Sequence, residues 1–296
     1  MHESVDRIAI IGAGAIGTAV GDLLKLAGKT VALWDKDPAK SNGNSLAATI
    51  AQAQVIILAV PSWANQPAAA AIPPLLSAQD HPLVITLAKG VEPGFVTMDK
   101  VLARAAKQKF DYGLLYGPML AEEIAGGKQS YGLLAVSDLK WRGCLDGVKG
   151  LCLAYTHDVS SVAVAGTLKN IYALGFGICD GLNLGSNTKG ALALKSVREM
   201  RGVLTVMDLD PGLAESYAGL ADLLATGWSE TSFNYRIGKA LAEGLTSNEH
   251  TQGEGVNAVK EITSVLEISR FPVMDAIYQV ATHQQKPDFF TAVIDD

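Results

Sequence analysis

One short segment near the start of the chain limits the possible folds more than any other. An apolar run at residues 7–11 leads directly into the sequence GAGAIG at residues 12–17, and a stretch with helical periodicity follows. A G-x-G-x-x-G pattern between a strand and a helix predicts the first turn of a doubly wound α/β sheet. Gly12 permits the tight turn, Gly14 lets the backbone approach a pyrophosphate, and Gly17 allows close helix–strand packing. The helix N-terminus then offers N–H groups to phosphate oxygens, so the segment predicts dinucleotide binding.

The first half of the chain alternates short apolar runs with helical stretches. Strands are expected at residues 7–11, 31–34, 55–60, 83–87, 113–116, 131–136 and 151–155, and the first helix at residues 15–27. Continuous apolar strands separated by helices are typical of a mostly parallel sheet that is covered on both faces. This half is therefore predicted to be an α/β domain of the Rossmann type.

After about residue 160 no further strand is expected. Helices are predicted at residues 161–178, 188–207, 213–224, 232–243, 257–268 and 272–282. A run of strands followed by a run of helices indicates two domains. We predict a dinucleotide-binding domain of residues 1–158 and an all-helical substrate and catalytic domain of residues 159–296.

The composition excludes several classes of protein. Apolar residues make up 49% of the chain, charged residues 18%, and the net charge is −6. A disordered chain needs low hydrophobicity and high net charge, and this chain has neither. Without a broad basic field no nucleic-acid partner is expected, and an anionic ligand has to be bound by a local cluster of cations.

Neither a membrane span nor a secretory signal is predicted. Residues 41–79 carry no Asp, Glu, Lys or Arg, but prolines and amides interrupt each apolar run before about 18 residues accumulate. The first residues lack a basic start and an apolar core. Cys144, Cys152 and Cys179 leave at least one thiol unpaired, which favours the reducing cytoplasm.

Other catalytic constellations have little support in the sequence. The five histidines form no H-x-x-x-H or similarly spaced pair, so no metal is predicted. The G-x-S-x-G pattern of many hydrolases is absent. His157 lies near the expected domain boundary, where a partly exposed polar residue is the simplest interpretation.

The choice of dinucleotide depends on Asp35, which ends the second predicted strand 18 residues after Gly17. A carboxylate there accepts hydrogen bonds from the adenosine ribose hydroxyls and repels a 2′-phosphate, which favours NAD over NADP. Lys36 follows immediately and is able to pair with a 2′-phosphate, so NADP stays open. An ordinary solvated turn is the alternative for both residues.

Short motifs recur along the chain in a defined order. They lie at residues 12–17, 60–62, 89–92, 117–118, 166–170, 180–187, 219–223, 232–236 and 253–255. From about residue 7 to about residue 280 this order resembles the NAD(P)-dependent glycerol-3-phosphate dehydrogenases, and the chain looks like a divergent member of that family.

The resemblance implies that Lys169 is the catalytic acid–base and that Lys89 contacts the substrate near the nicotinamide. The residues themselves agree, because a lysine in an apolar helix loses hydration or needs a partner, and desolvation lowers its pKa. Asp222 is expected to orient Lys169, with Asn170 and Thr226 completing the polar surroundings. The alternative is an ordinary helix lysine whose amine reaches solvent.

The same resemblance assigns further binding residues. The cofactor set is Gly12, Gly14, Ala15, Ile16, Gly17, Asp35, Lys36, Pro61, Lys89, Ala121 and Glu254. The substrate set is Gly117, Ser232, Asn234 and Arg236 together with Lys89, Lys169 and Asp222. For Glu254 an equally simple interpretation is a carboxylate in the first turn of a helix, where the helix dipole favours it.

The chain departs from the family pattern in three places, of which the first two are expected near the substrate. The family has an arginine that grips phosphate where this chain has Phe233, and a serine where this chain has Met119. The segment between Trp34 and Val55 is also shorter than in the family. A phenyl ring cannot replace the bidentate, charge-assisted bonds of a guanidinium. Three alternatives stay open: Arg236 binds the phosphate instead, the substrate is not a phosphate monoester, or turnover is weak or lost.

The sequence as a whole predicts a cytoplasmic, NAD-dependent dehydrogenase that interconverts sn-glycerol 3-phosphate and dihydroxyacetone phosphate by hydride transfer with a lysine acid–base. The alternatives are a related dehydrogenase for another hydroxy acid or polyol, and an NAD-binding protein without turnover. A homodimer is what the resemblance implies for the assembly.

Overall fold

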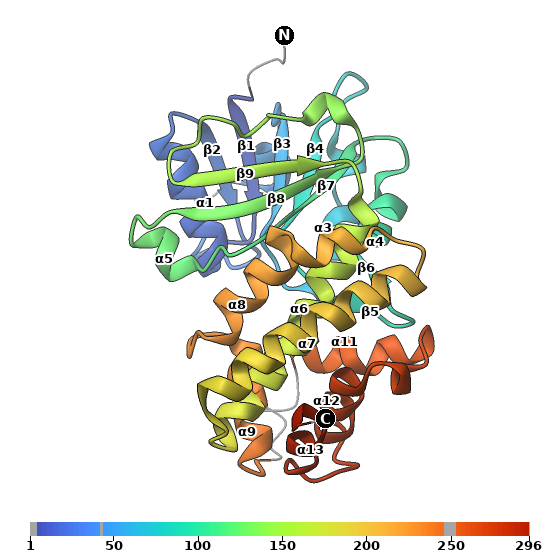
Figure 1. Ribbon diagram of the computed structural model, residues 1–296. Coiled ribbons are helices and arrows are strands. Elements are labelled where there is room, and N and C mark those ends of the chain that lie inside the picture. The colour runs from blue at the N-terminus through green and yellow to red at the C-terminus, as the bar shows by residue number, and fades with distance from the viewer. Residues whose placement is uncertain (1–4, 42–43, 246–252, 296) are drawn as a thin grey trace. The chain divides into compact units, whose positions relative to one another are not determined.

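The computed structural model describes residues 5–41, 44–245 and 253–295, and its contacts divide the chain into two compact units (Figure 1). The first unit comprises Met1–Ala88 and Met98–Ser160, and the second comprises Lys89–Thr97 and Ser161–Asp296. The sequence did not indicate that Lys89–Thr97 belongs with the helical part of the chain. The domain limits at residues 158 and 159 stay a prediction.

The first unit is built on one seven-stranded sheet. Its strands are β1 (Arg7–Ile11), β2 (Thr30–Trp34), β3 (Val55–Leu58), β4 (Leu83–Thr86), β7 (Asp111–Tyr116), β8 (Ser130–Val136) and β9 (Leu151–Thr156). They lie in the order β2-β1-β3-β4-β7-β8-β9, and all neighbours are parallel except β7 and β8. The predicted mostly parallel Rossmann-type sheet is confirmed.

Burial on both faces explains the continuous apolar strands. In β1, Ile8 and Ile10 pack with Val20 and Leu24 of the first helix in one core cluster, while Ala9 between them is also fully buried. The helices of this unit are α1 (Ala15–Leu26), α2 (Leu46–Ile50), α3 (Ser62–Ala70), α4 (Met98–Ala106) and α5 (Ala121–Ala125), with short 3₁₀ turns at Pro73–Leu75 and Leu139–Trp141.

The second unit is helical apart from the short hairpin of β5 (Val91–Glu92) and β6 (Val96–Thr97). Its helices are α6 (Val159–Gly181), α7 (Gly185–Val206), α8 (Asp222–Gly227), α9 (Phe233–Ala242), α11 (Glu254–Glu261), α12 (Pro272–Ala281) and α13 (Phe289–Asp295). Among the described helices, only α6 has the length and apolar character needed to cross a membrane. Its apolar window is entirely buried within the molecule, as in the core helix of a globular domain.

Two predicted helices are wrong in their extent. Residues 213–224 form a 3₁₀ turn (Pro211–Glu215), a π-helical turn (Tyr217–Ala221) and the start of α8. Ser216 separates the two turns, because its backbone is extended and its hydroxyl caps Ala218 N. Residues 257–268 are not one helix either. α11 ends at Glu261, and the hydroxyls of Thr263 and Ser264 bond to backbone carbonyls that a longer helix would use.

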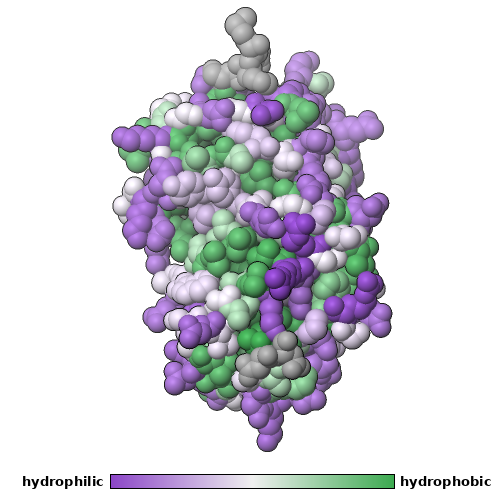
Figure 2. Space-filling view, viewed as in Figure 1, coloured by the Kyte–Doolittle hydropathy of each residue, from purple (hydrophilic) through white to green (hydrophobic). Residues whose placement is uncertain are grey.

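The surface drawn in Figure 2 mixes hydrophilic and hydrophobic side chains. Large apolar side chains that stay exposed include Trp63, Trp228 and Phe233. Two of these three belong to segments that the sequence associates with binding, since Trp63 follows Pro61 closely and Phe233 precedes Asn234.

Candidate active site

The glycine-rich loop of the first unit has the geometry that its pattern predicts. Gly12 has a φ of +106°, and a Cβ there would lie 2.6 Å from Ala59 O. A Cβ on Gly17 would collide with the carbonyl of Gly12. At Gly14 the space around the missing Cβ is open, and no side chain caps the start of α1. The loop is thus tight at its two packed glycines and open where a pyrophosphate would approach.

Asp35 is bound to this loop at the end of β2. Its Oδ2 accepts the N–H of Ala13 at 2.7 Å, and its Oδ1 accepts the N–H of Asp37 at 2.9 Å. The hydrogen bond from Asp37 is the largest influence on the carboxyl, and together with the bond from Ala13 it lowers the pKa of Asp35 despite some desolvation. Lys36 Nζ lies 5.5 Å from the centre of the Trp63 ring. The ionised carboxylate of Asp35 therefore holds the backbone of the glycine-rich loop at the end of β2.

A buried amide that the sequence did not single out supports the neighbouring strand ends. Asn65 is fully buried, and its Nδ2 donates to the carbonyls of Val60 and Pro61 at 3.3 and 3.1 Å. Its Oδ1 accepts the hydroxyl of Thr86 at 2.5 Å. Asn65 thereby fixes Pro61, one of the predicted cofactor residues, at the carboxyl edge of β3.

The structure explains why residue 117 is a glycine and shows where Ala121 lies. Gly117 has a φ of +153°, and a side chain there would collide with the backbone of Tyr131. Ala121 begins α5, which packs on α1. Ile16, Ala121 and Met119 all pack against the apolar core of this unit. Met119, which departs from the family pattern, thus contributes to the core.

The second unit brings four of the predicted catalytic side chains together. Asp222 Oδ2 lies 2.5 Å from Lys89 Nζ, and Asp222 Oδ1 lies 3.3 Å from Lys169 Nζ. Lys169 Nζ donates to Thr226 Oγ1 at 3.0 Å, and Thr226 donates to Asp222 Oδ1 at 3.2 Å. The side chains of Lys169 and Asp222 are 7% and 3% exposed, which confirms the predicted burial of Lys169. One carboxylate therefore serves two ammonium groups.

This arrangement changes the acidity of Lys169. The pKa of Lys169 is lowered to about 8. Desolvation by burial is the largest cause, the charge of Asp222 opposes it, and the positive charge of Lys89 adds to the lowering. A lysine with such a pKa gives up or takes a proton readily near neutral pH, as a general acid–base requires.

The side chain of Asn170 bonds to Lys89 and Glu254, although Asn170 follows Lys169 in the chain. Its Nδ2 donates to the carbonyl of Lys89 at 3.1 Å and to Glu254 Oε2 at 3.3 Å. Glu254 is the first residue of α11, and the next N–H of this helix, that of Gly255, donates to Asn234 Oδ1 at 3.0 Å. Asn170, Glu254 and Asn234 thus form a polar chain that begins at the Lys89 backbone.

Ser232 and Arg236 lie at the start of α9. Ser232 is the N-cap, and its Oγ accepts the N–H of Tyr235 at 3.4 Å. The guanidinium of the exposed Arg236 lies 5.8 Å from the centre of the Phe233 ring, one helical turn earlier. Among the described residues, no carboxylate forms an ion pair with Arg236.

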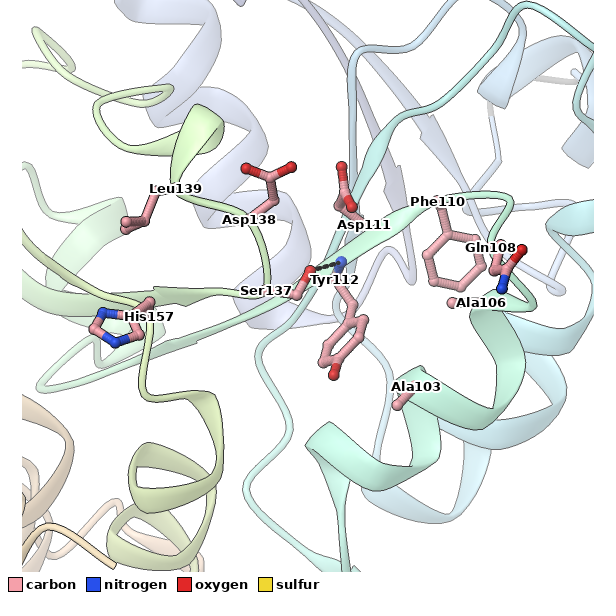
Figure 3. Close-up of a pocket in the computed structure, with 10 residues that line it drawn as sticks. All are labelled: Ala103, Ala106, Gln108, Phe110, Asp111, Tyr112, Ser137, Asp138, Leu139 and His157. Carbon is pink, nitrogen blue, oxygen red and sulfur yellow. Dashed lines mark hydrogen bonds between the residues drawn. The ribbon is translucent and has the colours of Figure 1, made fainter.

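A cavity of about 670 Å³ in the first unit is a poor candidate for the site (Figure 3). Tyr112, Ser137 and His157 line it, and Tyr112 N donates to Ser137 Oγ at 3.0 Å. The strand register places these residues at the edge where β4 and β7 begin, opposite the edge that carries the glycine-rich loop. Within the described part of the chain, no group of three or more His, Cys, Asp or Glu residues is arranged to hold a metal ion.

A Rossmann-type sheet with a glycine-rich turn, and a helical unit with a buried lysine on a carboxylate, define a dinucleotide-dependent dehydrogenase. The family comparisons agree. Residues 41–141 match the family described as NAD-dependent glycerol-3-phosphate dehydrogenase N-terminus, and residues 158–292 match the corresponding C-terminus. The chain belongs to the NAD-dependent glycerol-3-phosphate dehydrogenase family.

Individual relatives cover nearly the whole chain. Glycerol-3-phosphate dehydrogenase [NAD(P)+] of Lacticaseibacillus casei is 30% identical, over 93% of this chain and 90% of the relative. The enzyme of the same name from Acinetobacter baylyi is 27% identical, over 93% and 85%. The crystal structure of glycerol-3-phosphate dehydrogenase from Coxiella burnetii superposes with a TM-score of 0.84, at 25% identity, and covers 98% of both chains.

Proposed function

We propose that this protein interconverts sn-glycerol 3-phosphate and dihydroxyacetone phosphate with NAD as the redox partner. The observation that carries the proposal is the cluster of the buried Lys169, Asp222 and Thr226 with the half-buried Lys89 within one unit. Family membership and the relatives' names support the substrate pair.

Each residue of the cluster has a distinct part in the reaction. In the direction of ketone reduction, bound NADH supplies the hydride to the carbonyl carbon. The Lys169 ammonium gives its proton to the carbonyl oxygen, so that a neutral amine and a secondary alcohol result. Lys89 stabilises the negative charge that develops on that oxygen, and Asp222 orients both amines. In the reverse direction the neutral amine of Lys169 takes the hydroxyl proton.

The residues that would hold NAD are those of the glycine-rich loop and its surroundings. The open space at Gly14 and the uncapped start of α1 suit the pyrophosphate. We assign Gly12, Gly14, Ala15, Ile16, Gly17, Asp35, Lys36, Pro61, Lys89, Ala121 and Glu254 to the cofactor. The carboxylate of Asp35 favours NAD over NADP, because it would repel a 2′-phosphate.

We assign the phosphate of the substrate to Arg236, assisted by Asn234 and Ser232 of the same helix start. Gly117 of the first unit is kept as a separate proposed substrate residue. Arg236 is exposed and makes no ion pair with the described residues, and the Phe233 ring supports its guanidinium. An arginine displaced by one helical turn thereby replaces the arginine that the family carries at position 233.

The test of the proposed function is to mix the purified protein with NADH and a panel of phosphorylated and unphosphorylated ketones. Loss of the reduced-nicotinamide absorbance with dihydroxyacetone phosphate is the expected result. If only an unphosphorylated ketone leads to oxidation of NADH, the substrate is a different one. If no ketone of the panel leads to oxidation of NADH, the result contradicts a dehydrogenase. Arg236→Ala should raise the KM for dihydroxyacetone phosphate more than it lowers kcat.

The assembly and location are further proposals. A homodimer follows from the family resemblance, and size-exclusion chromatography with light scattering tests it. Three free cysteines, of which Cys144 and Cys179 are buried, support a reducing cytoplasm. We also propose residues 1–158 and 159–296 as the dinucleotide-binding and catalytic domains, with Lys89–Thr97 as an addition to the latter.

A further inference from the structure

The segment that carries Lys89 is packed into the second unit. Lys89–Thr97 belongs to that unit by its contacts, although the residues on both sides of it belong to the first. Val91 and Phe95 are 4% and 2% exposed, and both are part of the helical core. Lys89 therefore belongs to the same unit as Lys169 and Asp222, in a segment that the helical core holds.

The turn of the hairpin is conformationally unfavourable and needs support. Gly94 and Phe95 have φ values of +76° and +54°. Glycine adopts such a backbone freely, but a phenylalanine does so only where the surrounding structure holds it. Burial of the Phe95 ring in the core is one source of that support.

Hydrogen bonds from α6 and α11 supply the rest. Asn257 Nδ2 donates to Val91 O at 3.0 Å, and Glu261 Oε2 accepts the N–H of Gly94 at 2.7 Å. Asn170 of α6 binds the carbonyl of Lys89 itself at 3.1 Å. Asn257 and Glu261 are four residues apart and so share one face of α11, and this helix contacts β5.

We propose that Asn257 and Glu261 are positioning residues that keep Lys89 at Asp222 by fixing the backbone of the hairpin, an inference that rests on the proposed dehydrogenase function. Lys89 Nζ and Asp222 Oδ2 are 2.5 Å apart, and this distance depends on where the hairpin backbone lies. A hairpin that moves takes the positive charge away from both the substrate oxygen and Lys169.

The test compares Asn257→Ala and Glu261→Ala with the conservative Glu261→Gln. Lys260→Ala is the control, because Lys260 is an exposed residue of α11 that makes no side-chain bond to the hairpin. Amide hydrogen exchange of residues 89–97 should become faster in the two alanine variants. Their kcat/KM for dihydroxyacetone phosphate should fall on the order of tenfold to a hundredfold, the range expected for a misplaced reacting group.

Two further measurements separate positioning from a purely structural role. The pH at which ketone reduction declines should rise in the alanine variants, because the charge of Lys89 lowers the pKa of Lys169 and would be more distant. Binding of NADH, followed by its fluorescence, should change much less than kcat/KM, because the variants leave the glycine-rich loop of the first unit intact. Glu261→Gln should restore most of the activity, because its amide oxygen still accepts the N–H of Gly94.

Unchanged hydrogen exchange of residues 89–97, or faster exchange with wild-type kcat/KM and pH profile, would overturn the proposal. Failure of the proposed function looks different, since the wild-type protein itself would then not oxidise NADH with dihydroxyacetone phosphate. In that case the exchange rates of the same variants still decide whether Asn257 and Glu261 hold the hairpin.

Discussion

At the scale of single residues, the acid–base role that we propose for Lys169 predicts opposite pH dependences for the two directions of the reaction. Reduction needs the ammonium form, so kcat/KM for dihydroxyacetone phosphate should be constant at low pH and fall as the pH rises through about 8. Oxidation of glycerol 3-phosphate needs the neutral amine and should rise over the same range. Steady-state rates in both directions across pH 6–10 would check this.

Asp222 provides the control for that assignment. Its carboxylate raises the pKa of Lys169 against the effect of burial. Asp222→Asn should therefore shift the decline in reduction to lower pH, because the neutral amide stabilises the ammonium form less. A decline that stays at the wild-type pH in this variant would assign the titration to another group.

A second prediction for a single residue concerns Asp35 and the choice between NADH and NADPH. Because its two oxygens hold Ala13 and Asp37, Asp35→Ala should weaken NADH binding through a loosened loop as well as through lost ribose contacts. It should at the same time improve the use of NADPH relative to NADH, since the repulsion of a 2′-phosphate is removed. Steady-state kinetics with both cofactors give the ratio of kcat/KM for NADPH to that for NADH. If Asp35→Ala leaves this ratio unchanged, Asp35 does not determine the choice of cofactor.

At the scale of elements, the half-buried carboxylate of Glu199 joins three helices of the second unit, α6, α7 and α12. Glu199 of α7 accepts the N–H groups of Val273 and Met274 at the start of α12, at 2.7 and 2.9 Å, and the hydroxyl of Tyr172 at 3.1 Å. Burial is the largest influence on this carboxyl and raises the pKa of Glu199 above its ordinary value.

Glu199→Ala should destabilise the second unit by roughly 2–4 kcal/mol, because it leaves a helix start and a buried hydroxyl without partners. Urea denaturation followed by circular dichroism would measure the loss. Glu215→Ala is the matched control, because its ion pair with Arg201 is exposed and is expected to contribute at most about 1 kcal/mol. Equal midpoints for the two variants would contradict the bridging role of Glu199.

The raised pKa of Glu199 also makes the stability of the native state depend on pH. Its native carboxyl holds a proton more readily than the unfolded one, so this group favours the native state more as the pH falls through the native pKa. Its contribution to stability should therefore decrease as the pH rises from the ordinary pKa of glutamate through the raised native value. In Glu199→Gln this part of the pH dependence should be absent.

At the scale of the whole molecule, the sequence predicted those parts that depend on local pattern. The glycine-rich turn followed the first strand as expected, and the alternation of apolar runs and helices predicted the parallel sheet. The predicted helix boundaries were wrong where side chains compete with the backbone for hydrogen bonds, as those of Ser216 and Thr263 do.

The parts that depend on distant contacts could not be predicted from a single chain. Lys89 and Asp222 are 133 residues apart, and only the family resemblance connected them. The hairpin of Lys89–Thr97 has strands of two residues, too short for a periodic signal, although Pro93-Gly94 does indicate a turn. Asn257 and Glu261 look like the solvent face of an amphipathic helix.

The central claim is that Lys169 transfers the proton in a dehydrogenase whose dinucleotide is bound chiefly by the glycine-rich loop of the first unit. The most direct measurement is a pair of assays on Lys169→Ala: NADH binding by fluorescence, and NADH oxidation with dihydroxyacetone phosphate. We predict that binding stays close to the wild type while turnover is lost. Substantial turnover by Lys169→Ala would contradict the claim.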